Sequence, residues 1–231
     1  MRITILVDNA GAAGLRAEHG LSLWIEARGR RILFDTGQGN ALRGNARGLR
    51  APLERTDTIV LSHGHYDHAG GLAGVLKLAP AARLIVHPSA LFPRFSLPAG
   101  KPPRSIGFPP SALSACLRAR PGQIIWATRP VFIARGVGVT GPIVRRTAYE
   151  DSGGPFYLDT GGREKDPFAD DQALWIESPA GVIVCVGCCH AGLVNTLNQV
   201  RRTTGARRIR AVIGGFHLGA AGQDRLRRTA D

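Results

Sequence analysis

The chain has 231 residues, of which 44% are hydrophobic and 20% charged, and its formal net charge is +13 at pH 7. This length and composition predict a single globular domain over 1–231, and no apolar stretch approaches the length that crosses a bilayer. The arginines that supply most of the positive charge are scattered and few aromatic residues accompany them, so the charge alone does not favour a nucleic-acid partner.

The N-terminus and the cysteines indicate the cellular compartment of the protein. The N-terminus has no long apolar region or cleavage site, so we expect a cytoplasmic protein without a membrane partner. The four cysteines do not form a disulfide framework in a chain of this size. Cys185 lies inside an apolar run and is interpreted as a small buried hydrophobic residue, and His19 is interpreted as a surface residue.

The first third of the chain alternates short apolar runs with turns. These runs predict strands that pair antiparallel, at 2–7, 21–27, 31–37 and 57–62. Residues 69–80 have apolar positions at helical spacing and end at a proline, and 82–88 then predicts another strand.

Residues 88–122 have a different composition, with many prolines and three phenylalanines. A linker has little use for phenylalanine, so this segment is interpreted as a cap inserted over the core. The remaining elements are strands at 123–128, 130–141, 173–178 and 181–187, a helix at 192–205 and a last strand at 208–215.

The stretch LSHGHYDHAGGL, residues 61–72, crowds three histidines and an aspartate behind a predicted strand. In extended backbone, His63 and His65 point to the same side and can bind one metal ion. Asp67 and His68 follow at the turn into the next helix and offer ligands to a second ion. The alternative, surface histidines on a loop, does not explain this spacing.

Two later histidines follow strand ends, where sites on such sheets assemble. His190 comes after the run 181–187, and His217 comes after the run 208–215. Together with the cluster at 61–72, they are predicted metal ligands.

These motifs resemble the metallo-β-lactamase superfamily. The segments LVDN (6–9), ILFDTG (32–37), LSHGHYDHAGGL, DDQAL (170–174), GCCHAGLVNTL (187–197) and IGGFHL (213–218) resemble its dihydropterin ribofuranosyl-aminobenzene phosphate synthase branch. The resemblance implies a four-layer αββα sandwich with a binuclear metal site at one edge.

The resemblance also assigns roles to single residues. It implies the six metal ligands His63, His65, Asp67, His68, His190 and His217, with Asp67 also the candidate catalytic residue. Cys188 and Asp171 are weaker ligand candidates, with an inert buried thiol and a loop carboxylate as the alternatives. Asp35 resembles a carboxylate that orients a ligand histidine through its second ring nitrogen.

Members of this branch generally continue past the segment that corresponds to 213–218 with a further helix and strand, whereas this chain ends at Asp231. One expectation is a truncated C-terminal end, which would expose a sheet edge and favour homo-oligomers. The alternative is that the missing elements are dispensable.

The expected function is that of a metal-dependent enzyme acting on a small phosphorylated or pterin-like substrate. Two divalent ions, zinc first and iron or manganese as alternatives, would support either hydrolysis or the departure of a diphosphate group. Arg94 and Arg104 in the predicted cap and Tyr66 in the motif are the substrate-binding candidates. The alternatives are a metal-dependent nuclease acting on RNA or DNA and a non-catalytic metal-binding module.

Overall fold

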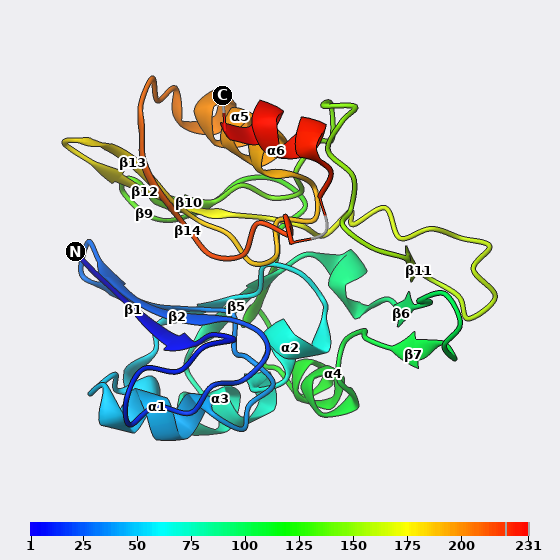
Figure 1. Ribbon diagram of the computed structural model, residues 1–231. Coiled ribbons are helices and arrows are strands. Elements are labelled where there is room, and N and C mark those ends of the chain that lie inside the picture. The colour runs from blue at the N-terminus through cyan, green and yellow to red at the C-terminus, as the bar shows by residue number, and fades with distance from the viewer. Residues whose placement is uncertain (220, 231) are drawn as a thin grey trace.

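Two β-sheets pack face to face between two layers of helices (Figure 1). This computed structural model describes residues 1–219 and 221–230, so Asp231, where a truncated end was expected, lies outside the described residues. The order helix, sheet, sheet, helix confirms the expected αββα sandwich. No helix within the described residues is long and apolar enough to cross a bilayer.

The first sheet contains most of the N-terminal half. Its six strands, in spatial order, are β1 (Arg2–Val7), β2 (Ser22–Ala27), β3 (Arg30–Phe34), β4 (Thr58–Val60), β5 (Arg83–Val86) and β8 (Ile124–Trp126). β1, β2 and β3 pair antiparallel, but β3, β4, β5 and β8 pair parallel. The prediction of antiparallel pairing is therefore wrong beyond β3. A crossover through α1 (Leu42–Gly48) and the 3-10 turn η1 (Leu53–Arg55) reverses the chain before β4 and makes parallel pairing possible.

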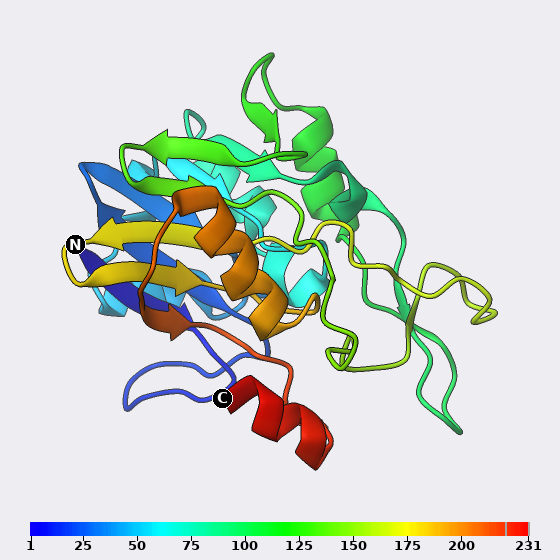
Figure 2. The ribbon, with the colours of Figure 1, turned by 90° about the horizontal axis from the view of Figure 1, so that it is seen from above.

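The second sheet is built from the C-terminal half. Its strands, in spatial order, are β14 (Ile209–Ile213), β13 (Gly181–Cys185), β12 (Leu174–Ser178), β10 (Val137–Val139) and β9 (Val131–Ala134). Only β13 and β14 pair parallel, and α5 (Leu193–Thr204) connects them across the outer face of the sheet (Figure 2).

Alternation of side chains along the strands builds three cores. In β2, Leu23 and Ile25 belong to the core between the sheets, whereas Trp24 belongs to the core under the helices of the first sheet. In the second sheet, Trp175 packs outward on the side of α5. Cys185 lies between the sheets, where burial raises the pKa of its thiol to about 12, as expected of an unreactive buried residue.

The predicted cap at 88–122 divides into two parts. Its first part, after the 3-10 turn η2 (Pro88–Leu91), pairs β6 (Phe95–Ser96) and β7 (Arg104–Ser105) with β11 (Phe156–Tyr157) in a small projecting sheet (Figures 1 and 2). Its second part forms α4 (Pro110–Leu117), whose Ala112 and Cys116 belong to the core below the first sheet. The spacing of four between those two buried residues makes this part a core helix and not a cover.

Three more helices complete the chain. α2 (Tyr66–Ala69) and α3 (Leu72–Leu78) follow β4 directly, so the motif of residues 61–72 lies at the carboxyl end of a central parallel strand. α6 (Gln223–Ala230) lies to one side of the second sheet (Figure 2).

Candidate metal centre

Three histidines each direct one nitrogen into a common buried space. His63 and His65 follow β4, and His190 follows β13. One ligand nitrogen of each lies within 4.8 Å of those of the other two. The three Nε2 atoms are buried and have no hydrogen-bond partner among the described residues. Buried nitrogen atoms without partners cost stability, and a bound metal ion would provide what they lack.

The protonation of these histidines suits ligation. Burial lowers the pKa of His63, His65 and His190 well below the ordinary value, and nearby imidazoles lower it further. The Nδ1 atom of His190 donates to the carbonyl oxygen of Ser152 at 2.9 Å, which leaves the lone pair on Nε2. Neutral imidazoles with free lone pairs are the form that binds metal ions.

A second set of ligand atoms lies directly beside the first. His68 Nε2 is 3.1 Å from Cys188 Sγ, and Asp67 Oδ2 is 3.5 Å from His68 Nε2. Two further groups have ligand atoms within 4.8 Å of one another, namely His63, His68 and Cys188, and Cys188, His190 and His217. Cys188 belongs to both of these groups, so it occupies the position that a bridging ligand would take.

Asp171, the weaker of the carboxylate ligand candidates, makes a hydrogen bond within the protein. Like Asp67, it belongs to none of the groups of three ligand atoms found among the described residues. Its Oδ2 accepts a hydrogen bond from the backbone N–H of Ala191 at 2.6 Å, and burial raises the pKa of its carboxyl to about 7. Asp171 therefore holds the turn that follows His190.

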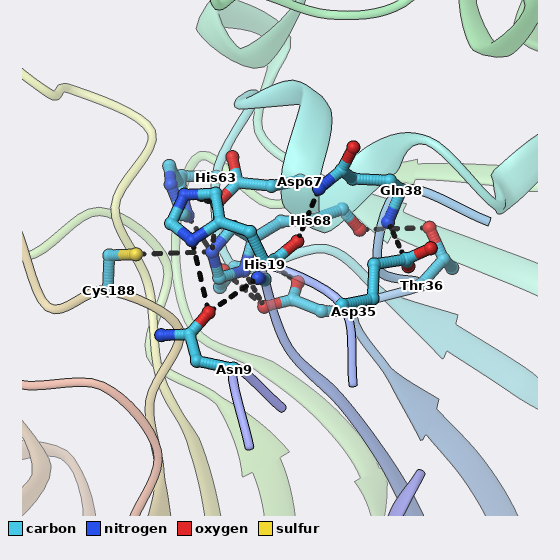
Figure 3. Close-up of polar contacts among 12 residues, drawn as sticks. Asn9, His19, Asp35, Thr36, Gln38, His63, Asp67, His68 and Cys188 are labelled. Carbon is cyan, nitrogen blue, oxygen red and sulfur yellow. Dashed lines mark hydrogen bonds and ion pairs between the residues drawn. The ribbon is translucent and has the colours of Figure 1, made fainter. Parts of the chain in front are cut away.

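Asp35 orients two of the histidines (Figure 3). Its carboxylate accepts hydrogen bonds from His68 Nδ1 at 2.6 Å, from Ser62 Oγ at 2.7 Å and from the Ser62 backbone N–H at 2.7 Å. Ser62 Oγ in turn lies 2.8 Å from His63 Nδ1 and can accept its proton. Both imidazoles are thus held with Nε2 toward the centre, which is the role that the resemblance implied for Asp35.

The backbone around the centre is strained. Asp35, Cys189 and His217 have φ values of 58°, 57° and 50°, in the left-handed region that side chains other than glycine rarely adopt. Residues held in such conformations cluster at functional sites.

Replacing Asp35 by asparagine is expected to weaken metal binding by about 10- to 100-fold. The amide has one acceptor oxygen in place of two. Its NH₂ group would face donors, either His68 Nδ1–H and the Ser62 hydroxyl or the Ser62 backbone N–H. Metal affinity should be measured by competition with a chromophoric chelator. As a control, Asp57→Asn removes a partly exposed carboxylate that pairs with Arg31 at the opposite end of β4 from His63, and should leave metal affinity unchanged. Equal affinity in Asp35→Asn and wild-type protein would contradict the orienting role.

Arg94 was predicted to bind substrate, but the structure buries its guanidinium in ion pairs. Its side chain is 1% exposed and pairs with Asp166 at 2.6 Å and with both oxygens of Asp170 at 2.6 and 2.8 Å. Asp170 also accepts a hydrogen bond from the backbone N–H of Gly64 at 2.7 Å. A side chain on Gly64 would meet Ala90 and Arg94, so this network supports the loop between His63 and His65 from behind.

The other two substrate-binding candidates lie against each other. The guanidinium carbon of Arg104, which is exposed, lies 5.8 Å from the centre of the Tyr66 ring. The backbone N–H of Tyr66 donates to the carbonyl oxygen of Ile106, which joins the motif to the projecting sheet.

His19 was interpreted as a surface residue, and although it is exposed, it contacts the centre (Figure 3). Its Nε2 lies 3.3 Å from Asp67 Oδ2, and its Nδ1 lies 3.0 Å from Asn9 Oδ1. The Asp67 carboxylate is thus placed between His19 and His68. His19 lies in a loop without periodic pattern, 48 residues before Asp67 in the sequence, so no local motif indicated it.

The sequence is similar to those of known proteins along most of its length. Residues 15–140 match the model of the metallo-β-lactamase superfamily. An uncharacterised protein of Methanocaldococcus jannaschii is 35% identical over 231 residues, covering 99% of this chain and 84% of its own length. The 7,8-dihydropterin-6-methyl-4-(β-D-ribofuranosyl)-aminobenzene-5′-phosphate synthase of the same organism is 30% identical over 240 residues, covering 96% of this chain and 79% of the synthase.

A solved structure is similar over nearly the whole chain. The crystal structure of Tm1679, described as a metal-dependent hydrolase of the β-lactamase superfamily, superposes with a TM-score of 0.80 and 30% identity. The match covers 98% of this chain and 80% of Tm1679.

Proposed function

The chain belongs to the metallo-β-lactamase superfamily, and on that premise we propose that it is a metal-dependent enzyme acting on a small phosphorylated or pterin-like substrate. The observation that carries this proposal is the convergence of buried, unpaired Nε2 atoms from His63, His65 and His190 beside His68 and Cys188.

The donor set supports two adjacent ions. His63, His65 and His190 would hold one ion. Cys188 would lie between the two ions, since it forms one ligand group with His68 and another with His217, and these two histidines would hold the other ion. Asp67, whose Oδ2 is 3.5 Å from His68 Nε2, would be a further ligand of that ion. Imidazole and thiolate donors together fit zinc best, and iron is the main alternative. When bound, such ions supply Lewis-acid chemistry, either polarising a substrate oxygen or lowering the pKa of a water molecule.

Asp67 is the proposed catalytic residue of this chain. It is one of the residues that line a cavity of about 150 Å³, together with His19, His68 and Cys188. Its Oδ2 lies 3.3 Å from His19 Nε2 at the same wall. Asp67 would thus meet a reacting group at the wall of this cavity and hold the proton that the reaction releases.

The substrate class rests on the similarity to the synthase, whose name specifies a phosphorylated pterin-linked product. Both hydrolysis and a condensation that releases an anionic group need charge stabilisation at the same place, so the metal centre is compatible with either reaction.

Elemental analysis followed by metal reconstitution tests the proposal. The protein as purified should contain zinc or iron, and chelator treatment should remove activity that the same metal restores. The substrate panel should contain an aryl phosphate, a pterin phosphate, a β-lactam, a thioester and a short RNA, and we expect the phosphorylated aromatic compounds to react best. Preference for RNA would favour the nuclease alternative, and a protein that binds no metal would contradict the proposal.

A further inference from the structure

A second, larger cavity lies beside the metal centre. It has a volume of about 430 Å³, and its walls come from residues 151–157, Lys165, His217, Ala221 and Arg225. His217 also belongs to a ligand group with Cys188 and His190. A molecule in this cavity would therefore reach the metal centre along His217.

Arg225, on α6, lines this cavity and has hydrogen-bond donors without partners among the described residues. Its side chain is 5% exposed, and its Nη1 pairs with a carboxylate oxygen of Asp151. Its Nε and Nη2 are buried and have no acceptor among the described residues. These two groups share one edge of the guanidinium, where two parallel N–H bonds match two oxygens of a phosphate or carboxylate.

Lys165 adds a second positive charge to the cavity. It is exposed, and a β-bridge to Tyr157 holds its backbone beside β11. Asp151 is the one carboxylate among the residues that line the cavity, so two cations face one anion there. The charge that remains after the Arg225–Asp151 pair is formed is positive, which favours an anionic group.

Aromatic side chains line the part of the cavity next to the metal centre. The Phe156 ring lies 5.3 Å from the His190 ring and 5.8 Å from the His217 ring, edge-on to both. Phe156 and Tyr157 both line the cavity. Flat apolar rings in a substrate would pack on such side chains.

We propose that Arg225 and Lys165 bind the phosphate group of the substrate in this cavity, while the reacting bond lies at the metal centre. This inference rests on the proposed function and deepens it. It places the phosphate contacts on α6 and near β11, and not on Arg94 of the predicted cap, whose charge is already paired.

Calorimetric titration with inorganic phosphate tests the proposal, with metal-free and metal-loaded protein in about 0.15 M salt, which screens the general positive charge. Arg225→Gln should weaken phosphate binding at least about tenfold, because it removes a bidentate charged contact. Lys165→Gln should weaken it by a smaller factor. Arg227→Gln is the matched control, because Arg227 is exposed on the same helix and pairs with Asp224; it should bind phosphate as wild type does.

Two results would overturn the proposal. One is an unchanged phosphate affinity in both Arg225→Gln and Lys165→Gln. The Lys165→Gln substitution changes only an exposed side chain, so its result does not depend on the Arg225–Asp151 contact. The other is an equal loss in the Arg227→Gln control, which would mean that general charge explains the binding. Acetate should bind more weakly than phosphate, and tighter binding of acetate would overturn the assignment to phosphate.

The same titration separates this inference from the proposed function. Phosphate binding that depends on Arg225 in metal-free protein would support the cavity assignment even if every substrate in the activity panel failed. Metal-dependent activity with phosphate affinity unchanged in both variants would overturn the cavity assignment and leave the proposed function standing.

Discussion

Alanine in place of His63 or His65 is expected to abolish activity and to remove the ion held by the three-histidine group. Each substitution deletes one of three buried Nε2 ligands. Loss of an outer hydrogen-bond partner typically lowers metal affinity about 10- to 100-fold, so loss of a ligand itself should lower metal affinity by about two orders of magnitude or more. The number of ions per chain, measured by elemental analysis after dialysis, should fall in parallel with activity.

His87→Gln is the matched control, because His87 lies at the start of η2 and accepts a hydrogen bond from the Ser89 backbone without belonging to any ligand group of the described residues. It should keep the wild-type metal content. Full metal content in His65→Ala protein would exclude His65 as a ligand.

Metal should also stabilise the wild-type protein more than the variants, which lose the ion of the three-histidine group. A ligand that binds only the folded state at a hundredfold excess over its dissociation constant stabilises by about 2.7 kcal/mol. In the metal-free protein, the three unpaired nitrogen atoms already cost stability, so His65→Ala should change the melting temperature little there. The difference between wild type and variant should therefore appear only when metal is present.

The local part of the site could be predicted from sequence because its spacing carries the chemistry. His63, His65, Asp67 and His68 lie within six positions after one strand, and the strand end fixes where they point. His190 lies just past β13 and could be predicted in the same way. The Asp35 contact with His68 spans 33 residues and was found only through the resemblance of its FDTG segment.

Contacts that join distant segments without a motif could not be predicted. The ion pair between Arg94 and Asp170 spans 76 residues, and an arginine in a proline-rich segment looks the same in sequence whether it faces solvent or a buried carboxylate. The parallel pairing of β3 with β4 was missed for a related reason. Strand runs alone do not show direction, which here depends on the crossover through α1.

Replacing Arg94 by methionine is expected to destabilise the protein by about 3–5 kcal/mol, because two buried carboxylates, Asp166 and Asp170, would lose their cation. Chemical denaturation at pH 7 would measure this loss. In the wild-type protein, burial already raises the pKa of Asp166 above its ordinary value, despite the opposing effect of Arg94. A raised pKa in the folded state means that the ionised carboxylate costs stability above the unfolded-state pKa. The deficit of the variant should therefore shrink as the pH falls toward about 4, the ordinary aspartate value.

Two further variants separate a structural role of Arg94 from a substrate-binding role. Adding Asp166→Asn and Asp170→Asn to Arg94→Met removes the unpaired charges and should recover part of the lost stability. Arg104→Met removes an exposed arginine of the same projecting sheet and should change stability by less than about 0.5 kcal/mol. If Arg94→Met protein instead has the stability of wild type and only a higher Michaelis constant for a phosphorylated substrate, Arg94 binds substrate and does not stabilise the buried network.

The structural role of Arg94 also predicts an effect on metal affinity. Because Asp170 also accepts a hydrogen bond from the Gly64 backbone N–H, Arg94→Met protein that is still folded at low temperature should bind metal more weakly than wild type.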